Sequence, residues 1–250
     1  MSAPVLVVAA QEVEIGALLS RGEHWSRGKL DRRPWWRGRV GGHCVVIAVT
    51  GEGRRLARAG AENAVRHFNP CFLLGVGVAG ALSPDLRQGH LVLSSEVVLE
   101  SGRRLSASAG ALSSAKELGI TPAAVLTTDR IVGDPAEKNR LWLGLQSPVA
   151  AVVDMESFDF AASAADCDVP FLLLRAVSDA ASEAVPYWLN DCRSASGAIG
   201  RARVAVRLPL HPRDALRLVQ LRGRISTCAE SLAESVERLL AVSIAAPPSS

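Results

Sequence analysis

The sequence predicts an α/β protein with a mainly parallel sheet that helices cover on both faces. Short apolar runs alternate with helix-like stretches along most of the 250 residues. The strand-like runs are apolar throughout, as in "PVLVVAA" near the start of the chain, which is typical of strands buried on both faces. The composition, 48% hydrophobic and 21% charged, is sufficient for a large core.

The predicted elements follow one another closely, without an internal repeat or a linker before the tail. Strands are predicted at residues 4–10, 45–49, 72–76, 91–98, 123–127, 149–153 and 171–177. Helices are predicted at residues 12–19, 53–68, 113–118, 135–145 and 156–165, the fourth with a proline at its start. We divide the chain into a catalytic domain, residues 1–183, and an Arg-rich helical extension, residues 184–250, packed on the same domain.

The tail differs in composition from the rest of the chain. Residues 201–224 carry seven arginines and a single acid, Asp214. The dipeptides Leu208-Pro209 and His211-Pro212 precede a helix predicted from Asp214. A last helix is predicted at residues 227–240. Two interpretations remain open: a solvated basic helix face, or a surface that contacts a membrane interface. Nucleic acid is not expected as a partner, because no reading motif accompanies the charge.

Other features exclude several classes of protein. No run approaches the roughly 18 apolar residues of a membrane-spanning helix, and no secretory signal is expected. The five cysteines are odd in number and scattered, which is typical of a reduced, cytoplasmic protein. The five histidines show no ligand spacing, so no metal site is expected.

The glycine run "GVGVAG", residues 75–80, has the G-x-G-x-x-G spacing of a dinucleotide-binding loop. That loop must open a helix, because the pyrophosphate binds at a helix N-terminus. Here Pro84 and Gly89 follow within about ten residues, and another strand begins at Leu91, which leaves no room for a crossover helix. The run is therefore interpreted as a tight strand-loop-strand connection, and a dehydrogenase is disfavoured.

Carboxylates follow three of the predicted strands, at the sheet edge where open α/β proteins bind ligands. An acid beside an apolar strand costs free energy unless it is paired or used. These residues are either site residues or acids at helix termini: Glu12, Glu14, Asp154, Glu156 and Asp179. We interpret Asp154 as structural and expect Arg175 to pair with a neighbouring acid.

Three segments carry a resemblance to a known family. "GVGVAGAL" (75–82), "VVDMES" (152–157) and "LLLRAVSD" (172–179) resemble the purine nucleoside phosphorylase and methylthioadenosine/S-adenosylhomocysteine nucleosidase superfamily. The resemblance covers about residues 4–180. "TTDRIVGDPAEKNRL" (127–141) and the Arg-rich tail look most like the hopanoid-associated branch, thought to remove adenine from adenosylhopane. The resemblance implies a three-layer α/β/α fold with a mixed central sheet, and a homo-oligomer, usually a dimer.

The resemblance also implies roles in breaking a purine N-glycosidic bond, which passes through an oxocarbenium-like state. Asp179 would protonate the leaving base, which needs a carboxyl that burial keeps protonated. Glu156 would accept two ribose hydroxyls, ionised by a helix N-terminus. Glu14 would activate water, with Glu12 as its rival. The expected binding residues are Met155 and Val78, Ala79 and Gly80 along the sugar, Ser178 beside Asp179, and Ile131 or Val132 as an apolar wall.

The nucleophile is inferred from absent arginines. Phosphorylases of the superfamily hold phosphate with an arginine in an N-terminal loop and another before the glycine run. Here the corresponding positions read "AAQE" and Leu74, which favours water. Arg54 or Arg55 could bring inorganic phosphate as a co-substrate, so phosphorolysis remains an alternative. No other cofactor is expected, and an inactive scaffold of the same fold is the alternative outside enzymes.

Overall fold

The computed structural model describes residues 3–145, 150–194 and 198–243, in which ten strands form one mixed sheet. The strands are β1 (Val5–Ala9), β2 (Glu23–Leu30), β3 (Arg33–Val40), β4 (His43–Val49), β5 (Phe72–Ala81), β6 (Leu91–Leu99), β7 (Arg104–Ser106), β8 (Thr121–Thr127), β9 (Ala150–Asp154) and β10 (Phe171–Asp179). The helices are α1 (Glu12–Arg21), α2 (Arg54–Phe68), α3 (Ala109–Glu117), α4 (Pro135–Gly144), α5 (Ser157–Ala165), α6 (Arg201–Arg207) and α7 (Pro212–Ser243), with 3₁₀ turns η1 (Tyr187–Cys192) and η2 (Leu208–Leu210).

Strand β5 is the hub of the sheet. It pairs in parallel with β1 and β10, and its last residues pair antiparallel with β9. The sheet order is β10-β6-β8-β9-β5-β1-β4-β3-β2, so the β10–β5 pairing closes the first five strands into a ring. The carboxyl ends of β1, β5, β9 and β10 therefore gather at one place, where the predicted site residues lie.

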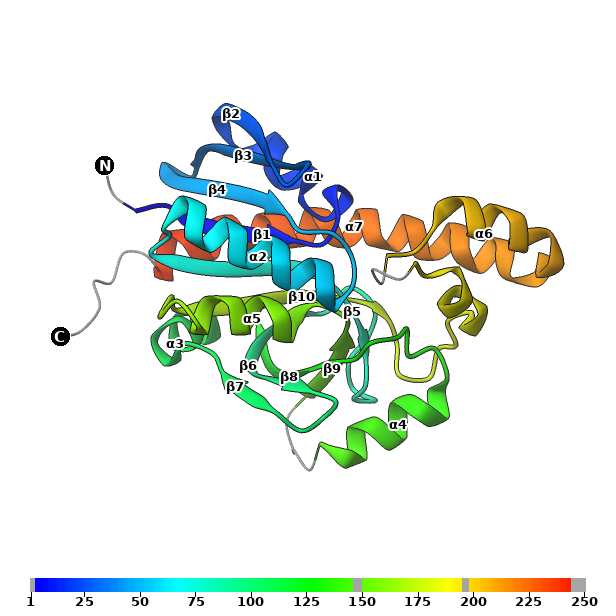
Figure 1. Cartoon of the computed structure of the whole chain (residues 1–250). Coiled ribbons are helices and arrows are strands. Elements are labelled where there is room, and N and C mark those ends of the chain that lie inside the picture. Colours follow the sequence, from blue (N-terminus) through cyan, green and yellow to red (C-terminus); the bar gives the residue numbers. More distant parts are fainter. Residues whose placement is uncertain (1–2, 146–149, 195–197, 244–250) are drawn as a thin grey trace.

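Helices cover both faces of this sheet, as Figure 1 shows. Alternate residues of β1 point to opposite faces, as the period of two requires. Val5 and Val7 pack in one core with α1 and α7, whereas Leu6 and Val8 pack in another with α2 and α5. This arrangement confirms the predicted three-layer α/β/α fold with a mixed central sheet.

The hairpin of β2 and β3 was not predicted. Its residues are mostly exposed or half-buried, so neither strand has the apolar run that marks a buried strand. The hairpin extends the sheet beyond β4 through antiparallel pairs. The predicted strand at 149–153 begins at Ala150 in the structure, and residue 149 lies outside the described residues.

The interpretation of residues 75–80 as a loop is wrong, because this segment lies within β5. Its glycines pair along the full length with Leu173–Asp179 of β10. Glycine normally weakens a strand and marks a close approach of other groups. Here side chains occupy the space that Cβ atoms would need, which explains why the glycines are tolerated in a central strand.

The two helices predicted in the tail form one continuous helix, α7, of 32 residues. No proline interrupts residues 213–243, and Gly223 alone costs only about 1 kcal/mol. The second half of α7 packs on α1, α3 and β10 through Cys228, Leu232 and Val236. Because packing stabilises that half, the helix continues through the glycine. The predicted domain division at residue 183 stays a prediction.

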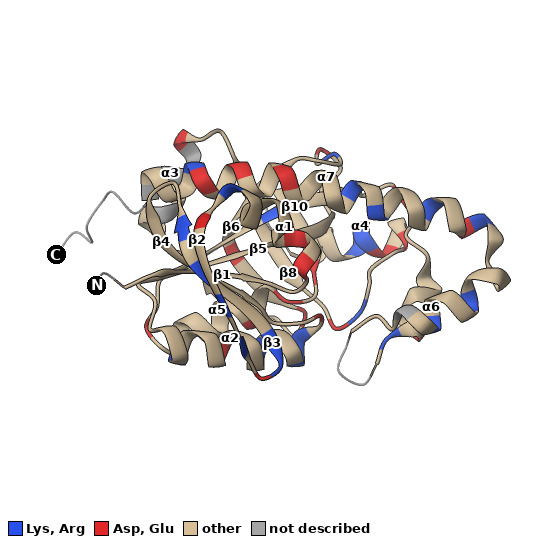
Figure 2. Ribbon diagram, turned by 90° about the horizontal axis from the view of Figure 1, so that it is seen from above, with Lys and Arg blue, Asp and Glu red and all other residues tan. Residues whose placement is uncertain are grey.

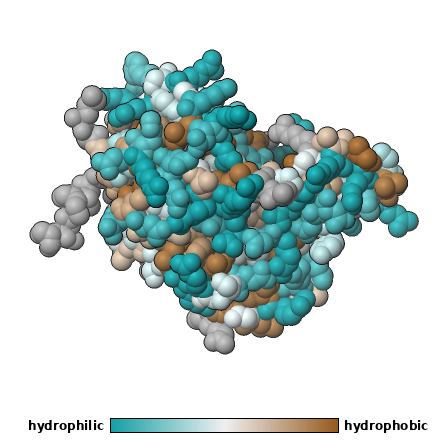
Figure 3. Space-filling view, viewed as in Figure 1, coloured by the Kyte–Doolittle hydropathy of each residue, from teal (hydrophilic) through white to brown (hydrophobic). Residues whose placement is uncertain are grey.

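The first half of α7 projects from the body together with α6 and η2, and we call residues 201–226 the arm (Figure 1). Figure 2 shows basic residues along it, and Figure 3 shows apolar surface near its end. Val206, Leu210, Leu216 and Val219 are each more than 65% exposed. In the described residues, no helix is long and apolar enough to cross a membrane.

The ion pair between Asp154, at the end of β9, and Arg175, within β10, is buried. Nε of Arg175 donates to Oδ2 of Asp154 over 2.8 Å, and both side chains are at most 3% exposed. Asp154 also accepts hydrogen bonds from Thr127 and from the backbone and hydroxyl of Ser157. The pair therefore joins β8, β9, β10 and the start of α5, as the structural interpretation of Asp154 predicted.

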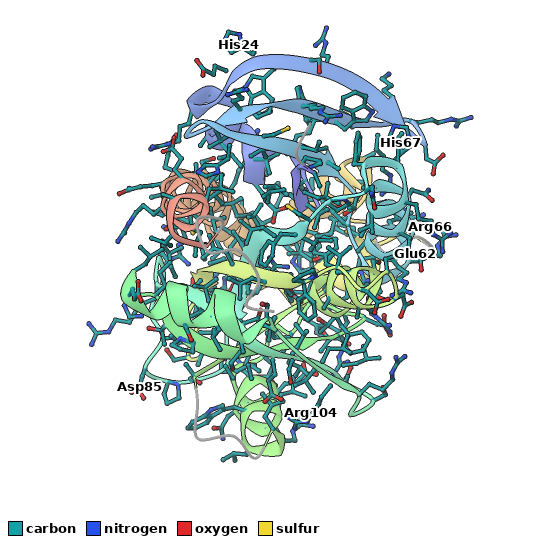
Figure 4. All side chains as sticks on the ribbon, turned by 90° about the vertical axis from the view of Figure 1, so that its left-hand side faces the viewer. His24, Glu62, Arg66, His67, Asp85 and Arg104 are labelled. Atoms are coloured by element: carbon teal, nitrogen blue, oxygen red, sulfur yellow. The ribbon has the colours of Figure 1, made fainter. Side chains whose placement is uncertain are left out.

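We expect Arg175→Met to lower the free energy of unfolding by about 3–5 kcal/mol, because it leaves a buried carboxylate unpaired. The matched control is Arg104→Met: this exposed arginine pairs with the half-buried Glu96 and lies at the surface in Figure 4. That change should cost less than about 1 kcal/mol. Urea denaturation measures both, and equal effects would contradict the assignment.

Candidate active site

A cavity of about 200 Å³ lies where β1, β5, β9 and β10 end. Of the residues predicted for the site, Glu14, Val78, Ala79, Gly80, Ile131, Val132, Met155, Glu156, Ser178 and Asp179 all line it. Segments separated by more than 160 residues in the sequence thus line the same cavity.

Glu14 lies in the first turn of α1 and points under β5. Its Oε2 accepts the N–H of Gln11 over 2.9 Å, and its Oε1 accepts the N–H of Val78 over 3.2 Å. The residue is only 7% exposed. Burial raises the pKa of Glu14 above its usual range, although the Gln11 hydrogen bond and the charge of Arg175 oppose the shift. The raised pKa makes the Glu14 carboxylate a stronger base, and the two hydrogen bonds hold it beside the glycine run.

Glu156 occupies the N-cap position of α5 but does not cap it. Its Oε1 instead accepts the N–H of Gly53 over 2.6 Å, across 103 positions of sequence. Burial, and then the nearby carboxylate of Asp154, raise the pKa of Glu156 to about 8. Burial and the Asp154 carboxylate therefore oppose the expected effect of the helix terminus, which favours the ionised form.

Asp179 ends β10 and is 6% exposed. Its Oδ1 accepts the hydroxyl of Ser178 over 2.6 Å, and its Oδ2 accepts Nζ of Lys138 over 2.5 Å. Lys138 comes from α4 and its side chain is 0% exposed. Ser178 thus lies beside Asp179, and Lys138 adds a buried ammonium group that the sequence did not predict as a partner.

Two glycines of β5 make room for two of these carboxylates. A Cβ atom at Gly77 would lie 2.8 Å from Oε1 of Glu14, and one at Gly80 would lie 2.9 Å from Oδ2 of Asp179. Both distances are shorter than a carbon and an oxygen can approach without displacement. The glycine run therefore leaves room for one carboxylate beside Gly77 and for another beside Gly80.

The outer wall of the cavity is apolar and comes largely from the C-terminal part of the chain. Ile131 and Val132 lie opposite residues that follow β10, since Asn190 in η1 bonds the N–H and the carbonyl of Ile131. The apolar residues that the C-terminal part contributes are Val185, Leu189, Ile199, Leu221 and Ile225. Two of them belong to α7, so the arm and the cavity share a helix.

Three predicted residues lie elsewhere. Glu12 is exposed on α1 and does not line the cavity. Nε of Arg54 donates to Asp159 over 2.8 Å, and its Nη1 lies 3.5 Å from Asp129. Arg55 is exposed on α2. Neither arginine is among the residues that line the cavity.

The histidines do not contribute to the site either. His24 on the hairpin and His67 on α2 lie at the surface in Figure 4. Within the part of the chain that the structure describes, no group of three potential ligands could hold a metal ion.

Sequence reasoning missed Lys138, Gln11 and Glu52. Nε2 of Gln11 donates to Glu52 over 2.6 Å, and Glu52 also accepts the N–H of Ile199, so this pair joins the β1 end to the outer wall. Lys138 did carry a signal. It is one of three lysines among 28 basic residues, and it lies in the first turns of a helix, where the dipole disfavours a cation.

Comparisons with known proteins place this geometry in a family. Residues 4–111 and 104–205 match the sequence model of the Phosphorylase superfamily. The 5′-methylthioadenosine/S-adenosylhomocysteine nucleosidase of Geobacillus kaustophilus (strain HTA426) is 28% identical over 200 residues, 71% of this chain and 84% of that protein. Its counterpart from Shewanella pealeana is 23% identical over 208 residues, 74% of this chain and 90% of that protein.

Solved structures agree on the fold. S-adenosylhomocysteine nucleosidase from Streptococcus pyogenes, in complex with 5-methylthiotubericidin, has a TM-score of 0.75 at 17% identity, covering 96% of each chain. A futalosine hydrolase mutant of Helicobacter pylori has a TM-score of 0.72 at 18% identity, covering 96% of this chain and 99% of that one. Since the family match extends from residue 4 to residue 205, the protein belongs to the Phosphorylase superfamily.

Proposed function

We propose that the protein hydrolyses the N-glycosidic bond of an adenine nucleoside. The observation that carries the proposal is the convergence of Glu14, Glu156 and Asp179 on one cavity, each in a different electrostatic setting. The curated relatives, which are nucleosidases acting on methylthioadenosine and S-adenosylhomocysteine, support the same reaction class. An inactive scaffold would have no need to bury three carboxylates beside a cavity.

The reaction needs acid and base on opposite sides of the sugar. As the bond from C1′ to the base breaks, positive charge builds on the ribose and negative charge on the purine. Asp179 donates a proton to the base, at N7, while Ser178 orients its carboxyl. Glu14 takes a proton from water, whose oxygen bonds C1′. Burial strengthens Glu14 as a base because it raises the pKa of that carboxyl.

Glu156 binds the ribose hydroxyls, and Met155 packs against the sugar. A carboxylate accepts two O–H groups at once, so nucleoside binding favours the ionised form of Glu156. The N–H of Gly53, in the loop before α2, donates to Oε1 of Glu156 and holds the carboxyl group in place. The segment from Val78 to Gly80 lies along the sugar, and Ile131 and Val132 contact the base.

Water is the proposed nucleophile. Among the described lining residues, Arg130 is the one arginine, and it is bound to Glu100 and Glu137. Arg54 is paired with Asp159, and Arg55 faces outward, so neither is placed to bring a phosphate to the sugar. Phosphorolysis remains the second candidate, since family members include phosphorylases.

The proposed substrate carries a long apolar group at its 5′ side, as adenosylhopane does. Two features support this. The apolar outer wall offers Val185, Leu221 and Ile225 to such a group. The arm, which continues from that wall, combines exposed apolar side chains with arginines, the composition of a surface that binds an anionic membrane. The proposal includes a cytoplasmic enzyme, dimeric like others of its superfamily, that takes its substrate from the bilayer.

We expect adenine release from methylthioadenosine, adenosine and an adenosyl-lipid without phosphate, at a rate that added phosphate leaves unchanged. Asp179→Asn and Glu14→Gln should each lower kcat by roughly 100-fold or more, because each removes one proton transfer. Glu12→Gln is the matched control and should retain the wild-type rate. Chromatography of released adenine measures all three, and phosphate-dependent release would establish phosphorolysis instead.

We also expect the affinity for a nucleoside to rise with pH up to about 8, the value to which burial and Asp154 raise the pKa of Glu156. Below that value a proton must leave before the carboxylate binds the ribose, so affinity falls by up to about tenfold per pH unit. Calorimetry with a non-hydrolysable C-nucleoside measures this. Glu156→Gln should bind weakly with no such slope, and an unchanged slope in that variant would assign it to another group.

The arm should bind vesicles that contain phosphatidylglycerol and not vesicles of phosphatidylcholine alone. Arg213→Glu with Arg217→Glu should reduce co-sedimentation at least tenfold, since each charge near the surface is worth about 1 kcal/mol. The matched control is Arg27→Glu with Arg39→Glu on the hairpin. Equal loss in both pairs would mean a nonspecific charge effect, and no binding by the wild type would remove the membrane from the proposal.

A further inference from the structure

The buried lysine of α4 contacts the predicted general acid, yet the mechanism above gives it no task. Lys138 is 0% exposed, and its Nζ contacts three oxygens: Oδ2 of Asp179 at 2.5 Å and the carbonyls of Ala180 and Glu183, both at 2.9 Å. An ammonium group has three hydrogens and no acceptor site. Three acceptors therefore match its charged form, and every hydrogen has a partner.

The carboxylate that the Lys138 ammonium group contacts is that of Asp179, so any effect of the lysine on the site acts through this residue. A buried charge needs a partner of opposite sign, and the nearest carboxylate is Asp179. The other oxygen of Asp179 already accepts Ser178. Asp179 is thus held from both sides, with its two oxygens fixed relative to the cavity that it lines.

Contacts of the neighbouring backbone also fix the position of Lys138. It lies in α4, whose N-terminus is capped by Asp134, and Gly133 sits so close to the carbonyl of Val185 that no Cβ would fit there. The N–H of Val185 in turn donates to Gly133 over 2.9 Å. The backbone around Lys138 is therefore locked against the segment that follows β10, and the lysine reaches Asp179 with little freedom.

We propose that Lys138 is a positioning residue that supplies, through Asp179, the proton taken by the leaving base. This inference rests on the proposed function. Nζ of Lys138 first gives a proton to the Asp179 carboxylate and is left as a neutral amine. As the bond between C1′ and N9 breaks, its electron pair moves into the purine, and N7 takes the proton from Asp179. Water bonds C1′ through oxygen and loses a proton to Glu14; solvent later takes up the proton of Glu14 and restores that of Lys138.

The first test is a double-mutant cycle on an adenine nucleoside. Lys138→Met should lower kcat by about 100-fold while KM changes less than threefold, because the general acid contributes about that much. In the Asp179→Asn background the same change should cause no further loss, since the lysine acts only through that carboxyl. Lys29→Met, an exposed lysine on β2, is the matched control and should match the wild type.

The second test separates proton supply from a structural role. A nitrophenyl riboside releases a phenolate that leaves without protonation, so Lys138→Met should reduce its cleavage less than threefold. Equal losses on both substrates, additive losses in the cycle, or a Lys138→Met enzyme within threefold of wild type on the adenine nucleoside would each overturn the inference. Thermal melting and C-nucleoside binding confirm that each variant is folded. A wild-type enzyme that releases no adenine would refute the proposed function itself, before any variant is compared.

Discussion

The ion pair between Asp154 and Arg175 is the interaction on which the site depends. It is buried at the wall of the cavity, which Asp154 lines, and joins three strands and one helix. Its influence is also electrostatic. The Asp154 carboxylate helps to keep a proton on Glu156, and the Arg175 guanidinium moderates the shift at Glu14. One structural pair thus sets the charge states of two residues that face the ligand.

A second constraint is the absence of a side chain at Gly77 and Gly80 of β5. Carboxylates on both sides of a strand usually need loops to bring them close, and loops are less rigid than sheets. Here the glycines allow Glu14 and Asp179 to approach a central strand directly. The acids are therefore held by the most rigid part of the molecule, which suits groups that must meet a ligand with little error.

The sequence predicted well those features that depend on local pattern. Apolar runs located the buried strands, and acids after those strands located the carboxylates of the cavity. The hairpin of β2 and β3 escaped notice because its exposed strands carry no apolar run. The pairing of Lys138 with Asp179 spans 41 positions and depends on how α4 docks, which no local pattern records. The protonation of Glu156 could not be predicted either, because it depends on burial and on the distance to Asp154.

Helix α7 has a mechanical consequence. Its second half is anchored in the core, its first half belongs to the arm, and Leu221 and Ile225 at the inner end of the arm line the cavity. A single unbroken helix behaves as a stiff lever with its fulcrum at the edge of the cavity. Any surface that binds the arm therefore also fixes the direction in which the cavity opens. The direction of this one helix then determines the orientation of the whole molecule.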